Sequence, residues 1–320
     1  MKTFTIVSKT HSDWLKSREE GIGSSEVATV LGVNPYDTPY QLWLRKTKQV
    51  ESEENENFLM KAGHYLEDAI SHFCADDADL DIVKSSASEF VVVDKEKPFL
   101  RASPDRYAFP KGEKHTDDNR VIIECKSTQK PVDPDNLSKY WFVQVMYQLR
   151  VTRVPSAYIA WLTQGRDFGC KPIYYDEDFG QFIAEEVERF WVDCVVGGRE
   201  PALSNVQDVI IKYPRHDEGK KIYATEELID LWSELKDTNA EIKRLQSQKD
   251  EIEAAMKTSM LDAERIVIKA DNDNPERTIA TWKASKESEK FDLETFRNEN
   301  PEVYAKYLKS TSGSRRFSLK

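Results

Sequence analysis

The spacing of hydrophobic residues in the first 200 positions alternates between a helical period and a strand period. Apolar residues recur at three- and four-residue steps from Phe58 to Phe73, which predicts an amphipathic helix. β-prone runs follow at Glu89 to Val93, Phe99 to Phe109 and Arg120 to Lys126. The last two runs are joined by a polar loop and predict an antiparallel hairpin. This mixture of helices and strands indicates an α/β or α+β domain.

Shorter patterned segments on either side complete this block. Ser25 to Leu31 has the pattern of a short helix, and a second helix begins after Pro39. The remaining predicted elements are a helix over 137–151, strands over 157–162 and 173–175, and a long helix over 179–196 that two glycines end.

After Pro214 the pattern becomes that of a long exposed helix. Apolar residues from Leu228 to Met256 follow one heptad frame, with Thr238 and Lys249 as polar interruptions. The frame predicts a coiled coil or helical hairpin, or equally a single amphipathic helix that lies on the first block.

The 320-residue length allows about two domains. Beyond the long helix we predict a strand over Arg277 to Lys283, a helix over Asp292 to Leu308 and a second strand over Arg315 to Leu319. We therefore divide the chain into a domain at 1–205, a connector at 206–222, an amphipathic or coiled-coil helix at 223–262, and a small α/β region at 263–320.

Composition narrows the class of protein. Hydrophobic residues make up 39% and charged residues 32%, and no apolar run approaches the ~20 residues of a membrane span. We expect a protein of the cytoplasm without a membrane partner. The four cysteines are far apart in sequence, which argues against a disulfide framework or a metal clip. The net charge of -11 argues against non-specific attraction to nucleic acid, so a DNA-acting protein would need a locally basic groove.

The most informative residues lie on the predicted hairpin. Side chains alternate along a strand, so Glu124 and Lys126 share one face. If the hairpin pairs as expected, Asp105 joins Glu124 in holding a divalent cation, because carboxylate oxygens are ligands that Mg²⁺ prefers. The backbone carbonyl of Cys125 could add an oxygen, and Lys126 could orient or help to deprotonate a bound water. A phosphodiester is the natural target of such a site.

A Glu-x-Lys tripeptide on a strand is usually only a solvated face, so neighbouring features matter. Ile122 and Ile123 make the strand apolar on both faces, which predicts a central position. Glu67 borders an apolar helix stripe, where a charge needs a ligand or a partner. Gln144 and Gln148 lie one helical turn apart and can reach a single site, although a polar helix face is the plain alternative.

The order of these motifs resembles a known family. The residues that carry the resemblance are Arg18, Gly21-Ile22-Gly23-Ser24-Ser25-Glu26, Leu31-Gly32-Val33-Asn34-Pro35-Tyr36, Gly63 to Glu67, Ser103-Pro104-Asp105, Glu124-Cys125-Lys126 and Gln144. Together they look like the YqaJ-type viral recombinase group, which is related to lambda exonuclease within the PD-(D/E)xK nuclease superfamily. The resemblance covers about residues 12 to 200 and rests on the ordered set rather than on one motif.

The resemblance implies a role for each matching residue. Asp105, Glu124 and Glu67 would be metal ligands, Lys126 the catalytic lysine, and Gln144 a support for the site. A pocket for the 5′-phosphate of a DNA end would be formed by Arg18, Ser25 and Ser103, and we place Gln148 among the DNA contacts. The implied fold is a PD-(D/E)xK core, a central mixed β-sheet flanked by helices, followed here by a C-terminal helical extension.

The expected function is a 5′ to 3′ exonuclease on linear double-stranded DNA that uses Mg²⁺, with Mn²⁺ as a substitute. Its 3′ single strands would serve a single-strand-annealing protein of the RecT or Bet type in a phage or prophage system. The resemblance also implies a homotrimer. Two alternatives remain open, namely an endonuclease or repair nuclease of the same superfamily, and a catalytically inactive DNA-binding recombination scaffold.

Overall fold

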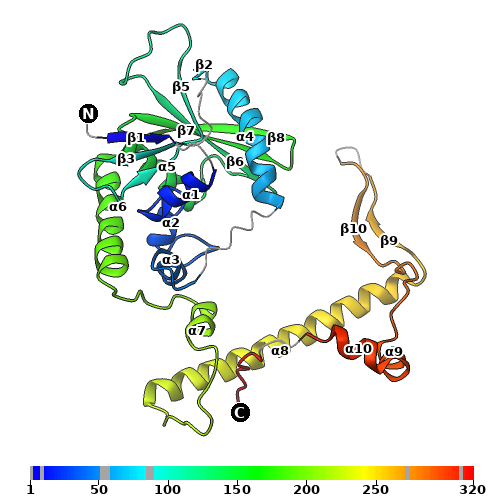
Figure 1. Cartoon of the computed structure of the whole chain (residues 1–320). Helices are drawn as coiled ribbons and strands as arrows, with labels where there is room; N and C mark the ends of the chain where they lie inside the picture. Colours follow the sequence, from blue (N-terminus) through cyan, green and yellow to red (C-terminus); the bar gives the residue numbers. More distant parts are fainter. Residues whose placement is uncertain (1–2, 8–10, 51–57, 84–89, 271–273, 310–312) are drawn as a thin grey trace. The chain divides into compact units, whose positions relative to one another are not determined.

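The computed structural model describes residues 3–7, 11–50, 58–83, 90–270, 274–309 and 313–320 (Figure 1). The chain forms two compact units, Met1–Lys212 and Tyr213–Lys320. The first unit contains every residue that the sequence nominates for catalysis.

A five-stranded mixed sheet lies at the centre of the first unit (Figure 1). β6 and β7 run parallel, and the other neighbours in the sheet are antiparallel. The predicted hairpin is therefore confirmed, and its second strand, with Ile122 and Ile123 fully buried, is the middle strand of the sheet. In spatial order the strands are β2 (Leu80–Ile82), β5 (Arg106–Pro110), β6 (Val121–Thr128), β7 (Ser156–Thr163) and β8 (Asp167–Tyr174).

A second, three-stranded sheet consists of β1 (Thr3–Val7), β3 (Phe90–Asp94) and β4 (Arg101–Ala102). The single strand predicted from Phe99 to Phe109 is wrong, because β4 and β5 belong to different sheets. Pro104 lies between them, and proline has no N–H to donate to a strand ladder. The extended chain is therefore interrupted at Pro104, and Asp105 lies directly before β5.

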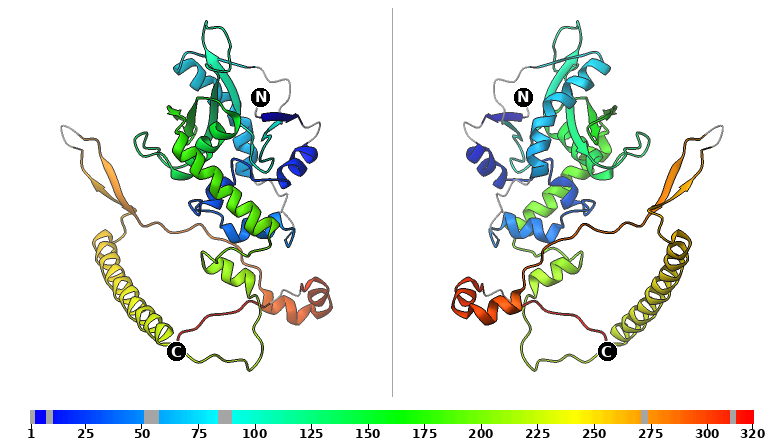
Figure 2. Two further views of the ribbon diagram at one scale, coloured as in Figure 1. Left: turned by 90° about the vertical axis from the view of Figure 1, so that its left-hand side faces the viewer. Right: turned by 90° about the vertical axis from the view of Figure 1, so that its right-hand side faces the viewer.

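Helices cover both faces of the five-stranded sheet (Figures 1 and 2). α4 (Phe58–Asp77) packs on β6, β7 and β8, and its Ile70 and Cys74 join one hydrophobic core. α5 (Lys139–Thr152) packs on β7 and belongs to the larger core on the other face. The mixed α/β fold with a central mixed sheet flanked by helices is confirmed. No helix within the described ranges is long and apolar enough to cross a membrane.

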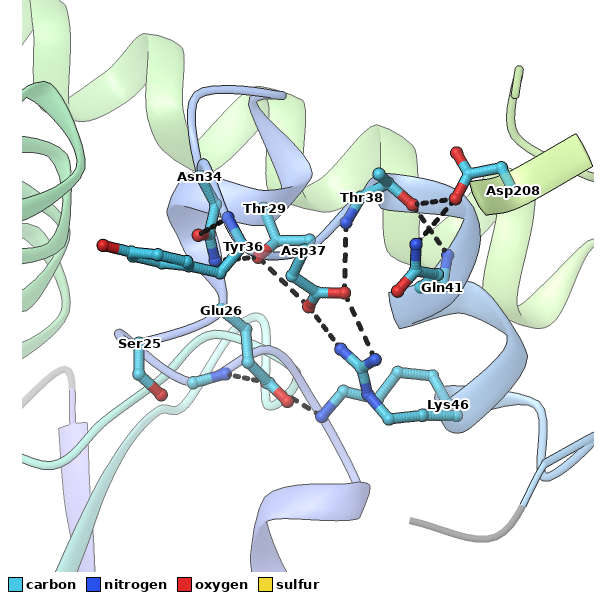
Figure 3. A network of polar contacts seen from close by, with 12 residues as sticks. Ser25, Glu26, Thr29, Asn34, Tyr36, Asp37, Thr38, Gln41, Lys46 and Asp208 are labelled. Carbon is cyan, nitrogen blue, oxygen red and sulfur yellow. Dashed lines mark hydrogen bonds and ion pairs between the residues drawn. The ribbon is translucent and has the colours of Figure 1, made fainter. Parts of the chain in front are cut away.

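The remaining helices of the first unit are α1 (His11–Glu19), α2 (Val27–Val30), α3 (Pro39–Lys46), α6 (Glu177–Arg189), the π-helical segment η1 (Phe190–Val196) and α7 (Val206–Lys212). α7 lies where the sequence predicted a connector. Its fully buried Asp208 accepts hydrogen bonds from Thr38 Oγ1 and Gln41 Nε2, both at 2.8 Å (Figure 3). These bonds attach α7 to α3, so the first unit extends to Lys212 rather than to residue 205.

The second unit begins with the predicted long helix, α8 (Glu226–Met260), which Thr225 caps by accepting a hydrogen bond from the N–H of Leu228 at 3.3 Å. Its heptad residues are exposed, for example Leu231 at 53% and Ile242 at 59%. Pairing or docking of this helix stays a prediction.

Beyond α8, β9 (Arg265–Ile268) pairs antiparallel with β10 (Arg277–Thr281). The strand predicted over Arg315 to Leu319 is wrong, because the partner of β10 is β9, a segment that the sequence analysis missed. The helix predicted over Asp292 to Leu308 is two helices, α9 (Leu293–Glu299) and α10 (Pro301–Tyr307), because Pro301 starts a new helix.

Candidate active site

The pairing of β5 with β6 brings two of the nominated carboxylates to one level of the sheet. Arg106 pairs with Ile123, so the next residues outward, Asp105 and Glu124, are level with each other. The N–H of Cys125 donates a hydrogen bond to Asp105 Oδ2 at 2.7 Å. This bond fixes Asp105 against β6, which is the arrangement that the hairpin prediction required.

Glu124 is 2% exposed and is surrounded by donors. Lys126 Nζ lies 2.6 Å from Glu124 Oε1, and Gln144 Nε2 donates to the same oxygen at 2.5 Å. Gln148 Nε2 donates to Glu124 Oε2 at 2.7 Å. A buried carboxylate is tolerated only with such partners, so the four side chains form one coupled cluster.

The two glutamines come from one face of α5, as their four-residue spacing predicts. Lys126 also donates to Gln144 Oε1 at 2.9 Å, so Gln144 bridges the ammonium and the carboxylate. Gln148 is fully buried, and its second neighbour is Ser24 Oγ at 3.4 Å from Gln148 Nε2. The structure thus places Gln148 against Glu124, and its role as a DNA contact stays a prediction.

Electrostatics of the cluster favour a bound cation. Burial, followed by the charges of Glu124 and Glu67, raises the pKa of Asp105 well above its usual value. Burial opposes the charge of Lys126, but Glu124 and Asp105 outweigh burial and raise the pKa of this ammonium. The carboxylates of Asp105, Glu124 and Glu67 therefore lie with the ammonium of Lys126 in a region from which solvent is partly excluded. A divalent cation would relieve the repulsion among the three carboxylates.

Glu67 is less well placed than the other two carboxylates. Its Oε1 lies 2.9 Å from His64 Nδ1 and its Oε2 lies 3.8 Å from a guanidinium nitrogen of Arg106. In the part of the chain that the structure describes, no group of three or more His, Cys, Asp or Glu side chains is arranged to hold a metal ion. The donor types fit a magnesium site, while the side chains are turned toward protein partners.

A hollow of about 200 Å³ opens beside this cluster. It lies between α4 and β6 and is lined by Gly63, His64, Glu67, Ile70, Cys125 and Ser127. The hollow gives the edge of the carboxylate cluster an opening on the α4 side of the sheet.

The residues nominated for a phosphate pocket are only partly brought together. An Arg18 guanidinium nitrogen donates to Ser25 Oγ at 2.7 Å. Ser103 is partly buried between β4 and β5, and among the described residues no hydrogen bond links it to Arg18 or Ser25. Arg18 and Ser25 therefore lie together as predicted, and the role of Ser103 stays a prediction.

Sequence reasoning missed one charged residue beside this pair, Lys46, which contacts Glu26 of the quoted motif. Lys46 Nζ lies 2.9 Å from Glu26 Oε2 (Figure 3). The same ammonium donates to the carbonyl of Arg18 at 2.9 Å. The N–H of Gly23 donates to the same Glu26 oxygen at 2.8 Å. The signal was available, because Lys46 follows the fully buried Leu42 by one helical turn and so shares its buried face.

Comparison with known proteins identifies a matching domain family and a relative that matches over nearly the whole chain. The YqaJ-like viral recombinase domain matches residues 13–155. The chain is 31% identical over 326 residues to the Bacillus subtilis (strain 168) protein named "Uncharacterized protein YqaJ", with 96% of this chain and 93% of that protein covered.

Solved structures of lower similarity are also found. An alkaline exonuclease from Laribacter hongkongensis has a TM-score of 0.44 and 16% identity, covering 57% of this chain and 91% of that one. A phage-related exonuclease from Haemophilus somnus 129PT has a TM-score of 0.39 and 13% identity, covering 56% of this chain and 96% of that one. Scores this low carry no argument about activity, so the chemistry must come from the residues of this chain.

Proposed function

Since the chain belongs to the YqaJ-like viral recombinase family, we propose that it is a metal-dependent nuclease that degrades linear double-stranded DNA from its 5′ ends. One observation carries the proposal. Asp105 is far from Glu124 in sequence but is level with it across the β5–β6 pair, and the ammonium of Lys126, two residues along β6, contacts the Glu124 carboxylate. Desolvation offsets much of the attraction in a buried ion pair, so stability alone gives little reason for a charged pair 2.6 Å apart beside a second carboxylate.

Asp105 and Glu124 would hold the divalent cation, with the Cys125 carbonyl as a further oxygen ligand and Glu67 as the residue that could complete the set. Mg²⁺, or Mn²⁺ in its place, supplies Lewis-acid activation of the attacking water and of the phosphodiester. The strand register, which brings Asp105 level with Glu124, supports this assignment, and burial together with Glu124 and Glu67 raises the pKa of Asp105.

Lys126 works as a charged group in this proposal. Its neighbours Glu124 and Asp105 outweigh the effect of burial and raise its pKa, so it remains an ammonium at neutral pH. An ammonium held at this position can orient a water and stabilise the negative charge that develops on a phosphate oxygen. Gln144, which contacts both Lys126 and Glu124, keeps these two side chains in place.

The 5′ polarity rests on the pair of Arg18 and Ser25, one of which offers a guanidinium and the other a hydroxyl. A guanidinium next to a hydroxyl donor suits a terminal phosphate. Lys46 adds a buried positive charge whose pKa is lowered mainly by burial, although Glu26 raises it. We include Ser103 as a further phosphate contact on the ground of its motif.

Degradation of this kind leaves 3′ single strands, which are the substrate of a phage-type annealing protein in the bacterial cytoplasm. We include the annealing protein as a partner, and a homotrimer as the assembly, because the family resemblance implies both. The intact cluster argues against an inactive scaffold, and the position of the first cut separates an exonuclease from an endonuclease.

The test uses the purified full chain with Mg²⁺ and duplexes labelled at the 5′ or the 3′ end, beside a closed circular duplex. We expect early release of the 5′ label as short products, slow loss of the 3′ label and an intact circle. A chelator should stop all release. Cutting of the circle would replace the proposal with an endonuclease, and equal release of both labels would remove the polarity.

A further inference from the structure

The second unit contains a pocket that the proposed nuclease chemistry does not use. It has a volume of about 660 Å³ and lies where the start of the unit meets the end of the chain. Its lining residues are Pro214, Arg215, His216, Gly313, Ser314, Arg315 and Arg316. Two segments separated by about 100 positions therefore meet at this pocket. A guanidinium nitrogen of Arg315 links them by donating a hydrogen bond to the carbonyl oxygen of Tyr213 at 3.3 Å.

The lining is strongly positive in an acidic protein. Three arginines contribute the positive charge, and among the described residues that line the pocket there is no Asp or Glu. The chain as a whole has a net charge of -11, so this local excess of positive charge is opposite to the general trend. Guanidinium groups offer paired N–H donors that match phosphate oxygens, and the ligand class that fits is a phosphate-bearing polyanion.

Two exposed aromatic residues flank the lining segments in sequence. Phe317 follows Arg316 directly and is 82% exposed, and Tyr213 precedes Pro214 and is 49% exposed. Exposed aromatic rings next to arginines are the combination with which proteins bind single-stranded nucleic acid, because rings stack on unpaired bases while cations contact the backbone. Duplex DNA has no free base faces to offer, so the rings favour a single strand.

We propose that this pocket, which is lined by Arg215, Arg315 and Arg316, binds the backbone of single-stranded DNA, and that the exposed ring of Phe317, the residue after Arg316, stacks on a base of the same strand. Ser314 adds a hydroxyl donor beside the arginines. An acidic peptide would be attracted by the same charges but would leave the exposed ring of Phe317 without a stacking partner. Binding here requires no cleavage, so the site is tested separately from the nuclease.

The experiment measures binding by the full chain in chelator, which prevents cleavage. The probes are a labelled thymidine oligonucleotide of about 12 nucleotides, an abasic oligomer of the same length, a duplex and a polyglutamate peptide. The variants are Arg315→Ala with Arg316→Ala, and separately Phe317→Ala. The matched control is Arg244→Ala, because Arg244 lies in the same unit and already forms an ion pair with Glu241 at 2.7 Å.

We expect the double arginine variant to lose about tenfold in affinity for the oligonucleotide, and its salt dependence to become shallower by about 1.4, since about 0.7 is expected for each lost phosphate contact. Phe317→Ala should reduce binding of the thymidine oligonucleotide to the level of the abasic oligomer. Arg244→Ala should leave binding unchanged.

Three results would overturn the proposal. Unchanged affinity in the double variant would remove the pocket as a binding site. Equal losses for polyglutamate and oligonucleotide would assign it to an acidic protein partner. Equal binding of the abasic oligomer, the duplex and the thymidine oligonucleotide by the wild-type chain would exclude base stacking. Cleavage of a short duplex, measured in parallel with Mg²⁺, should be the same in all variants whatever these results are.

Discussion

The replacement Gln148→Leu separates a positioning role from a structural one. Gln148 is fully buried and donates a hydrogen bond to Glu124 Oε2 at 2.7 Å. Among the described residues it is the one hydrogen-bond donor to Oε2, whereas Oε1 accepts from both Lys126 and Gln144. Leucine has nearly the same size, so the substitution removes the hydrogen bond and opens little space. The carboxylate of Glu124 is then held at one oxygen only.

The effect on stability should be small because two contributions oppose each other. A hydrogen bond to a charged group is worth about 1.5–3 kcal/mol, and its loss destabilises the fold. Gln148 Oε1, however, is buried without a hydrogen-bond partner, and its removal recovers about 1–3 kcal/mol. We expect a net change within about 1 kcal/mol, which corresponds to a melting shift of about 2–4 °C for a unit of this size.

The effect on cleavage should be much larger. Loss of orientation in a catalytic group costs up to about a hundredfold in rate, so we expect a fall of about 10- to 100-fold in Mg²⁺-dependent digestion of linear duplex. Melting temperature and initial rate are measured on the same preparation. Digestion at the wild-type rate would show that Gln148 does not position Glu124, and a melting shift beyond about 10 °C would show that its role is structural.

Three further expectations follow from other parts of the molecule. Arg18→Ala should abolish the preference for a 5′-phosphate over a 5′-hydroxyl end in digestion rates, and a preference that persists would assign the phosphate contact elsewhere. Asp208→Ala should lower the free energy of unfolding by about 3 kcal/mol in denaturant titrations, because donors from Thr38, Gln41 and Ser204 lose their acceptor. A loss below about 1 kcal/mol would contradict the attachment of α7 to α3. Burial alone would raise the pKa of Asp208, but these hydrogen bonds lower it, so its contribution should be present above pH 3.8 and lost as the pH falls further, an effect absent from the variant. A chain that ends at Lys212 should still cleave short duplexes but lose oligomerisation, measured by light scattering, or binding of the annealing protein, measured by pull-down. A truncated chain that folds but does not cleave would show that the second unit completes the active site.

The part of the site that depends on local pattern could be predicted from the sequence. Strand alternation placed Glu124 and Lys126 on one face, and the helical period placed Gln144 and Gln148 together. Both are consequences of backbone geometry within one element, so they do not depend on the rest of the fold. The hairpin also carried Asp105 to Glu124, because its two strands are neighbours in sequence.

The parts that were wrong or missed depend on contacts between distant segments. The partner of β10 is β9 rather than residues 315–319. Strand propensity indicates which segments can form a strand, but it does not determine which two segments pair. Asp208 looked like a linker residue, since nothing in its own segment reveals that it meets Thr38. The four-residue spacing of Gln144 and Gln148 indicates one shared site, but it does not reveal that Gln148 donates to Glu124 Oε2.

The most direct test of the central claim compares the wild-type chain with Asp105→Asn, Glu124→Gln and Lys126→Met on end-labelled linear duplex. The cluster proposal requires that each substitution reduces Mg²⁺-dependent release of the 5′ label by about a thousandfold or more, because a lost ligand or ammonium removes several kcal/mol of transition-state stabilisation. Circular dichroism spectra should match that of the wild-type chain. Release within about tenfold of the wild-type rate by any one folded variant would contradict the assignment of these three residues as the catalytic centre.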